Sequence, residues 1–95
     1  MSEIWKLIFR THAIQRMFQR RINETDVRHI LTTGETIEVY PDDTPYPSRL
    51  VLGWIEKRPL HIVVADNEAD GETIVITVYE PEQEKWSADF KRRIP

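Results

Sequence analysis

The chain has 95 residues, of which 40% are hydrophobic, and it contains no cysteine. This length predicts one domain, residues 1–95, whose core can form without a metal or a disulfide. The lack of cysteine excludes disulfide frameworks, thiolate zinc sites and thiol nucleophiles. No run of about 18 apolar residues occurs, and the N-terminal segment lacks a signal-peptide core, so we expect a cytoplasmic protein without a membrane segment.

The net charge of −3 is distributed unevenly along the chain. Residues 1–21 carry five basic residues against one acidic residue, and residues 85–95 carry four against one. Residues 22–84 carry four basic and fourteen acidic residues. Because the ends of a compact domain often lie close together, the two basic segments could form one patch for a polyanion. A solvated face without any ligand would show the same charge distribution.

The N-terminal part of the chain predicts a short strand followed by a helix. Residues 4–9 are bulky and apolar and indicate a strand or an extended lead-in. Thr11 is a candidate N-cap for a helix that runs to about Arg21. The helical spacing predicts a buried stripe made of Ala13, Ile14, Met17 and Phe18.

A second helix is predicted to begin after Asn23. Ile22 and Val27 flank this N-cap at the spacing of a hydrophobic staple, and Asp26 can complete a capping box. Gly34 is expected to end the helix. The buried face of the helix is predicted to consist of Val27, Ile30 and Leu31.

After the second helix the apolar period changes from 3.6 residues to two, which predicts strands. The four expected strands are residues 36–40, 49–57, 60–66 and 73–79. In the last two, the alternation assigns to the core Leu60, Ile62, Val64, Ile74, Ile76 and Val78. Short connections between strands imply antiparallel pairing. The expected fold is therefore α+β, with two N-terminal helices packed on a roughly four-stranded antiparallel sheet.

Two histidines and their neighbours form a candidate catalytic group. His12 and Arg16 share one flank of the first helix, because they are four residues apart. If the last hairpin pairs residues whose numbers sum to about 140, His61 lies opposite Tyr79. Histidine suits proton transfer near neutral pH, and the arginine fork suits phosphate oxygens.

These four side chains predict a site for cleaving a phosphodiester by attack of the adjacent 2′-hydroxyl, without metal or cofactor. The candidate catalytic residues are His12, Arg16, His61 and Tyr79. Arg20, on the same helical flank, and the tail residues Lys91 and Arg92 are candidates for binding RNA. A histidine at a helix start is also typical of a surface or capping residue, and one in a strand often only packs.

Other ligand patterns are weak. The three histidines show no metal-ligand spacing, and the acidic loop residues lack an EF-hand register. The three glycines do not cluster as in phosphate-binding loops. Trp54, Trp86 and Tyr46 could stack on bases, although we expect both tryptophans to pack in or beside the core.

An ordered set of short motifs resembles one bacterial family. The set comprises H-A-x-x-R-M-x-x-R-x-I from residue 12, V-x-x-I-L-x-x-G from 27, Y-P-x-D from 40, R-P-L-H-I-V-V from 58, I-T-V-Y-x-P from 76 and W-x-x-D-F-K-x-R from 86. Together these motifs, over residues 8–93, look like the family catalogued as domain of unknown function 4258.

This resemblance implies a function as well as a fold. Members of the family are regarded as toxins of type II toxin–antitoxin pairs, related to the RelE and BrnT ribonucleases and encoded beside a small antitoxin. It thus implies a RelE/BrnT-like fold, an mRNA substrate and an antitoxin partner, and it leaves the oligomeric state open. The polar residues that match by position are His12, Arg16, Arg20, His61, Tyr79 and Arg92.

Two functional hypotheses follow from the sequence. The first is a metal-free endoribonuclease whose polar residues converge in a basic groove between the first helix and the tail. The second is a non-catalytic regulatory module that binds a protein or a small ligand, in which the same residues would be scattered or held in structural hydrogen bonds.

Overall fold

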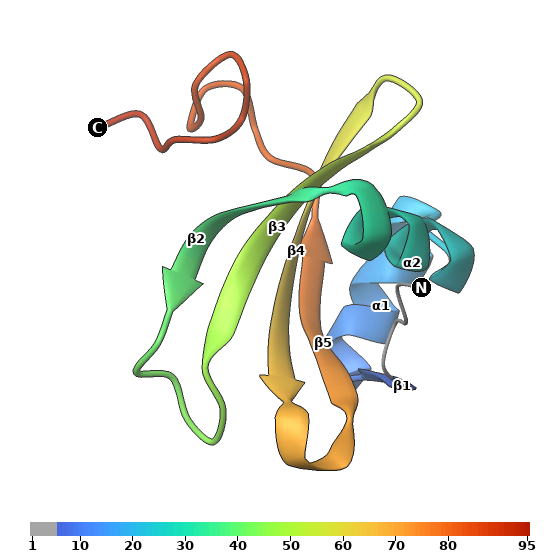
Figure 1. Ribbon diagram of the computed structural model, residues 1–95. Helices are drawn as coiled ribbons and strands as arrows, with labels where there is room; N and C mark the ends of the chain where they lie inside the picture. Colours follow the sequence, from blue (N-terminus) through green and yellow to red (C-terminus); the bar gives the residue numbers. More distant parts are fainter. Residues whose placement is uncertain (1–5) are drawn as a thin grey trace.

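The computed structural model describes residues 6–95, which form two helices and a five-stranded sheet (Figure 1). None of the described helices is long and apolar enough to cross a membrane. The elements in chain order are β1 (Lys6–Phe9), α1 (Thr11–Arg20), α2 (Glu24–Thr33), β2 (Glu35–Tyr40), β3 (Ser48–Ile55), β4 (Arg58–Asn67), a short 3-10 turn (Glu68–Asp70) and β5 (Glu72–Tyr79).

The sheet is mixed, with the strand order β1-β5-β4-β3-β2. Strands β2 to β5 form the antiparallel meander that the sequence predicts. β1 adds a fifth strand, parallel to β5, so the prediction of a four-stranded antiparallel sheet is wrong at this edge. Pairing between segments more than 60 residues apart leaves no local signal in the sequence. The predicted strand began at residue 4, and residues 4 and 5 lie outside the described part of the chain.

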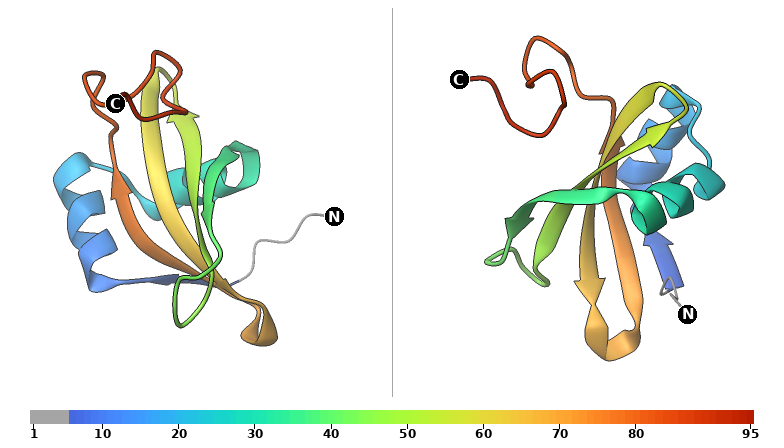
Figure 2. Two further views of the ribbon diagram at one scale, coloured as in Figure 1. Left: turned by 90° about the vertical axis from the view of Figure 1, so that its left-hand side faces the viewer. Right: turned by 45° about the horizontal axis from the view of Figure 1, so that its top comes forward.

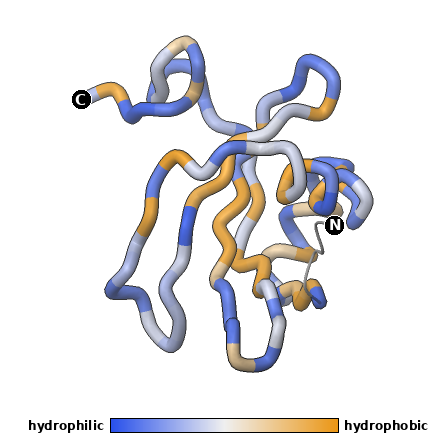
Figure 3. Tube along the Cα trace, in the orientation of Figure 1, coloured by the Kyte–Doolittle hydropathy of each residue, from blue (hydrophilic) through white to orange (hydrophobic). Residues whose placement is uncertain are grey.

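A different part of the chain lies on each face of the sheet. Both helices lie on one side, and the C-terminal segment, residues 80–95, lies on the other (Figures 1 and 2). Figure 3 shows apolar residues along the middle of β3, β4 and β5 and mainly hydrophilic residues in the loops below them. The helix-side core includes Ala13, Met17, Val27, Ile30, Val51, Leu60, Ile62, Val64, Val75 and Val78.

Helix α1 buries a narrower stripe than predicted. Ala13 and Met17 are buried, but Ile14 is 54% exposed and Phe18 is 86% exposed. The helix packs against one strand, β5, so a single line of apolar side chains on the helix is enough to form this contact. Thr11 is also not the N-cap: that position is Arg10, which makes no side-chain capping hydrogen bond.

Helix α2 begins as the sequence predicts. The Asn23 Oδ1 atom accepts a hydrogen bond of 2.8 Å from the amide of Asp26, whose Oδ2 atom accepts one of 3.1 Å from the amide of Asn23. The helix ends before Gly34, which has an extended backbone. A Cβ atom at Gly34 would lie 2.6 Å from the carbonyl oxygens of both Ile30 and Leu52, so this glycine permits close packing of α2 on β3.

The hairpin of β4 and β5 has the predicted register at one end. His61 lies opposite Tyr79, and Leu60, Ile62 and Val64 are fully buried towards the helices. A bulge at Ile76, which lies between the paired residues Val75 and Thr77, shifts the register by one residue. Val75 therefore enters the helix-side core and Ile76 is only half-buried, which corrects the predicted alternation in β5.

Candidate functional site

A surface groove of about 370 Å³ lies between α1, the end of β5 and the C-terminal segment. We call it the α1 groove. Three of the four predicted catalytic residues, His12, Arg16 and Tyr79, line it, together with the predicted RNA-binding residue Arg20. Its remaining lining residues are Thr77, Glu80, Glu82, Lys85, Trp86 and Arg93.

The charges of the groove are not balanced. The carboxylates of Glu80 and Glu82 are paired with Arg58, at 2.6 Å, and with Lys85, at 3.6 Å. Arg16, Arg20 and Arg93 form no ion pair within residues 6–95. Three guanidinium groups therefore remain available to an anion, and the planar fork of arginine matches phosphate oxygens.

Arg58 ties one wall of the groove to the sheet. Its guanidinium donates a hydrogen bond to the backbone carbonyl of Arg20, at the end of α1, and contacts Glu80, just after β5. These contacts fix the end of α1 relative to β5. The spacing of Arg16 and Arg20 from Tyr79 is therefore set by the fold and not by the ligand.

His61, the fourth predicted catalytic residue, lies beneath the groove and is fully buried. Its Nε2 atom is 2.9 Å from the carbonyl oxygen of Phe90, and its Nδ1 atom is 3.1 Å from the hydroxyl of Tyr79. A carbonyl can only accept, so Nε2 carries the proton and Nδ1 accepts the hydrogen bond from Tyr79. His61 can therefore act on a ligand only through Tyr79.

The environment keeps both members of this pair neutral. Burial lowers the pKa of His61, and the hydrogen bond to Phe90 and the charge of Glu38 only partly oppose this effect. Burial also raises the pKa of Tyr79, against the opposing charge of Arg93. The phenol of Tyr79 thus keeps its proton, while its oxygen can still accept a hydrogen bond from a molecule in the groove.

The C-terminal segment closes over His61. The ring of Trp86, which is 4% exposed, meets the His61 ring edge to face, with centroids 4.4 Å apart. The guanidinium carbon of Arg93 lies 4.9 Å from the centre of the Trp86 ring. Phe90 is also buried, and it packs with Leu50 and Leu52 of the sheet. The packing expected for Trp86 is confirmed, and Arg93 is held at the groove by its stacking on that ring.

The other two predicted RNA-binding residues lie elsewhere. The Nζ atom of Lys91 is 3.0 Å from the Glu35 carboxylate, and Lys91 lines a separate cavity beside His29 and Trp54. Arg92 lines a third hollow with Ser87 and Asp89. Because the C-terminal segment turns several times, its basic side chains point in different directions. The spacing of these residues in the sequence does not predict those directions.

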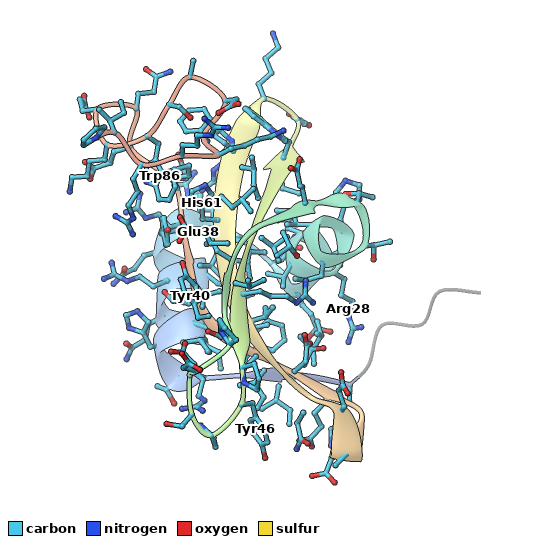
Figure 4. All side chains as sticks on the ribbon, turned by 60° about the vertical axis from the view of Figure 1, so that its left-hand side comes forward. Arg28, Glu38, Tyr40, Tyr46, His61 and Trp86 are labelled. Carbon is cyan, nitrogen blue, oxygen red and sulfur yellow. The ribbon has the colours of Figure 1, made fainter. Side chains whose placement is uncertain are left out.

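The sequence interpretation missed four residues at or near the groove. Arg93 and Lys85 stand out in the sequence only as members of a basic tail. Glu38 and Tyr40 follow the alternation of an ordinary strand, so no local signal distinguishes them. They lie on the same sheet face as His61, and Figure 4 shows Trp86, His61, Glu38 and Tyr40 one below another on this side of the molecule.

No group of three or more possible metal ligands lies together within residues 6–95. The groove presents histidine, arginine and tyrosine to a ligand, with carboxylates that are already paired with cations. Such a set can bind an anion and transfer protons.

A family model, described as Domain of unknown function (DUF4258), matches residues 9–80. This range contains His12, Arg16, Arg20, His61 and Tyr79, whereas residues 81–95, with Lys91 and Arg92, lie outside it. No curated protein and no solved structure was found to match the chain. Because the matched range covers well over half of the chain, the protein belongs to the DUF4258 family.

Proposed function

We propose that the protein is a metal-free endoribonuclease that cleaves RNA in the α1 groove. The observation that best supports this proposal is that His12, Arg16, Arg20 and Tyr79, from two distant elements, line one groove with unpaired cationic charge. The groove offers proton-transfer groups beside anion-binding groups, which is the combination that phosphodiester cleavage needs.

The cleavage begins with the 2′-hydroxyl next to the scissile phosphate. This hydroxyl gives its proton to the Tyr79 oxygen while the Tyr79 proton passes to Nδ1 of His61. The 2′-oxygen then attacks phosphorus, and the bond to the 5′-oxygen breaks. Arg16 and Arg20 stabilise the additional negative charge of the pentacoordinate phosphorus.

The leaving 5′-oxygen takes a proton from the imidazolium form of His12, at the edge of the groove. The products are a 2′,3′-cyclic phosphate and a 5′-hydroxyl end, so atoms and charges balance without a co-reactant. The positive charge that His61 acquires is stabilised by the carbonyl oxygen of Phe90, 2.9 Å from Nε2.

We further propose that the protein acts in the cytoplasm as the toxin of a type II toxin–antitoxin pair and has a fold related to RelE and BrnT. The resemblance of its motifs supports this role. The acidic middle of the chain, with fourteen acidic residues against four basic ones, supports a basic segment of a small antitoxin as partner.

A second candidate is a non-catalytic binding module for a protein or a small ligand. It is favoured by the environment of His61, since both ring nitrogens are engaged in internal hydrogen bonds, as in a purely structural histidine. In that case the groove would bind an anion without chemical change.

The test is induced expression of the wild type beside Arg16→Ala and Tyr79→Phe, with growth followed and total RNA probed for new 5′-hydroxyl ends. We expect arrest and cleavage with the wild type only. The matched control is Arg28→Ala, on the helix side of the sheet (Figure 4), where Arg28 forms an ion pair with exposed Glu24; it should behave as wild type. If well-expressed wild type leaves RNA intact, the nuclease proposal is wrong and the binding module replaces it.

A further inference from the structure

The sheet face opposite α1 and α2 carries an aromatic and an acidic side chain, Tyr40 and Glu38, that the cleavage scheme does not use. The strand register places Glu38 of β2, Leu50 of β3, Val63 of β4 and Thr77 of β5 in one row across this face. Tyr40 lies at the β2 end of the face, and Tyr79 lies at the β5 end. We call this surface the open face and define it by Glu38, Tyr40, Leu50, Val63, Thr77 and Tyr79.

The open face carries a half-buried apolar side chain, Val63, between its two tyrosines. Tyr40, Val63 and Tyr79 are half-buried and pack against one cluster, in which Leu50 is fully buried. Half-buried rings beside apolar side chains can stack with a planar ligand without rearrangement of the sheet. Thr77 and Tyr79 also line the α1 groove, so the two surfaces are continuous.

Glu38 is the acidic group of this face, and it is held in place. The hydroxyl of Tyr40 donates a hydrogen bond of 2.7 Å to Oε1 of Glu38. Burial, followed by the hydrogen bond to Glu38, raises the pKa of Tyr40 to about 12, so the phenol remains a donor. Within residues 6–95, Oε2 of Glu38 has no hydrogen-bond partner, which leaves it free to accept one from a ligand.

We infer that the open face binds the base of the nucleotide whose phosphate lies in the α1 groove, and that Glu38 selects guanine. This inference rests on the proposed ribonuclease function and adds its base preference. The base stacks against Tyr40 or Tyr79, and the carboxylate of Glu38 accepts hydrogen bonds from the base edge.

The preference for guanine follows from the donors of each base. Guanine carries two neighbouring donors, N1–H and the 2-amino group, which match the two oxygens of a carboxylate. Uracil has one N–H between two carbonyl oxygens, and these repel the carboxylate. Adenine and cytosine place a single amino group beside a ring nitrogen that can only accept.

The test measures binding of guanosine 3′-monophosphate and uridine 3′-monophosphate to the full chain by isothermal titration calorimetry. We expect the wild type to bind the guanosine nucleotide at least about tenfold more tightly than the uridine nucleotide. Glu38→Gln replaces an acceptor by an amide that is partly a donor, so the two affinities should become equal. Glu68→Gln, in the exposed 3-10 turn away from this face, should leave the preference unchanged.

A second pair of variants tests stacking. Tyr40→Leu should weaken binding of the uridine nucleotide by about tenfold, because every base has a face that can stack, and binding of the guanosine nucleotide by more, because the Tyr40 hydroxyl also holds Glu38. Tyr46→Leu, in the proline-rich loop outside the open face, should weaken neither. Unchanged binding of the uridine nucleotide by Tyr40→Leu would contradict stacking at this position.

The outcomes separate the inference from the function on which it rests. If the wild type cleaves RNA but binds the two nucleotides equally, or if Glu38→Gln keeps the preference, the guanine site is wrong and the nuclease stands. If the wild type neither binds either nucleotide nor cleaves RNA, both the nuclease and the guanine site are wrong.

Discussion

Tyr79 is the residue through which the buried and the exposed parts of the site communicate. Its hydroxyl donates to His61, which has no contact with solvent, and its ring lines the α1 groove. Neither side chain would serve the proposed reaction alone: the buried imidazole cannot reach a substrate, and a phenol with a raised pKa is a poor base without an acceptor behind it. The pair acts as one proton acceptor.

Replacement of Tyr79 by phenylalanine removes the proton path and keeps the ring packing. We expect Tyr79→Phe to lower the initial rate of RNA cleavage about 100-fold or more. The unfolding midpoint should fall as well, because Nδ1 of buried His61 loses its partner, but the protein should remain folded. The rate is measured on a fluorescent RNA oligonucleotide. Tyr46→Phe is the matched control and should cleave at the wild-type rate; near-normal cleavage by Tyr79→Phe would remove Tyr79 from the mechanism.

The neutral state of His61 predicts a pH dependence of stability. Because burial lowers the pKa of His61 in the folded protein, the unfolded chain binds its proton more readily, with a pKa of about 6.5. The free energy of unfolding should therefore fall as pH decreases below about 6.5. Urea denaturation at a series of pH values from about 7.5 to 5 measures this fall.

His61→Gln provides the control for this prediction. Glutamine can still donate to the Phe90 carbonyl and accept from Tyr79, but it does not titrate. The variant should show a smaller loss of stability below about pH 6.5, because the glutamine side chain takes up no proton on unfolding. Identical pH profiles for the two proteins would mean that the pKa of His61 is not lowered by folding.

At the scale of the elements, α2 is specified by its own residues to a greater degree than α1. The capping box of α2 is complete, whereas α1 begins without any side-chain cap. The end of α1, where Arg20 lies, is fixed instead by the hydrogen bond from Arg58. The element that carries the proposed catalytic residues is therefore held by tertiary contacts.

Loss of the α2 cap should affect stability but not catalysis. Asn23→Ala removes the acceptor for the Asp26 amide, and we expect it to lower the free energy of unfolding by about 1 kcal/mol. Urea denaturation measures the change, and the cleavage rate should stay at the wild-type value because α2 does not line the groove. The partial control is Asn23→Ser, which keeps a capping oxygen and should lower the free energy of unfolding much less.

At the scale of the whole molecule, the distribution of positive charge decides where RNA can bind. The prediction that the basic termini meet is supported for Arg16 and Arg20 of α1 and for Lys85 and Arg93 of the C-terminal segment, which line one groove. It does not hold for Lys91, whose charge is paired with Glu35 at a separate cavity.

The salt dependence of RNA binding distinguishes a cation that lines the α1 groove from one that is already paired with a carboxylate. Each phosphate contact of single-stranded RNA contributes about 0.7 to the slope of log K against log salt concentration. Arg20→Ala should therefore reduce the slope of RNA binding by about 0.7, and Lys91→Ala should leave it nearly unchanged. Fluorescence anisotropy at several salt concentrations gives both slopes; an equal reduction in the two variants would place the RNA path over Lys91 as well.

The sequence alone determined the features that depend on near neighbours in the chain. The start of α2, the four strands of the meander and the pairing of His61 with Tyr79 follow from caps, apolar periods and a short hairpin. The flank shared by His12, Arg16 and Arg20 follows from helical spacing. These features need only interactions over a few residues, or across one turn, to be specified.

Only the tertiary structure decided the features that depend on distant segments. Three such features are the pairing of β1 with β5, the exposure of Phe18 and the burial of His61 under Trp86. Each depends on which segments pack against one another in the folded protein. The placement of Arg93 in the groove likewise depends on an irregular segment. Such a segment has no regular repeat, so the direction of its side chains cannot be predicted from their spacing in the sequence. The local sequence therefore selects candidate side chains, and long-range packing decides which of them reach a common ligand.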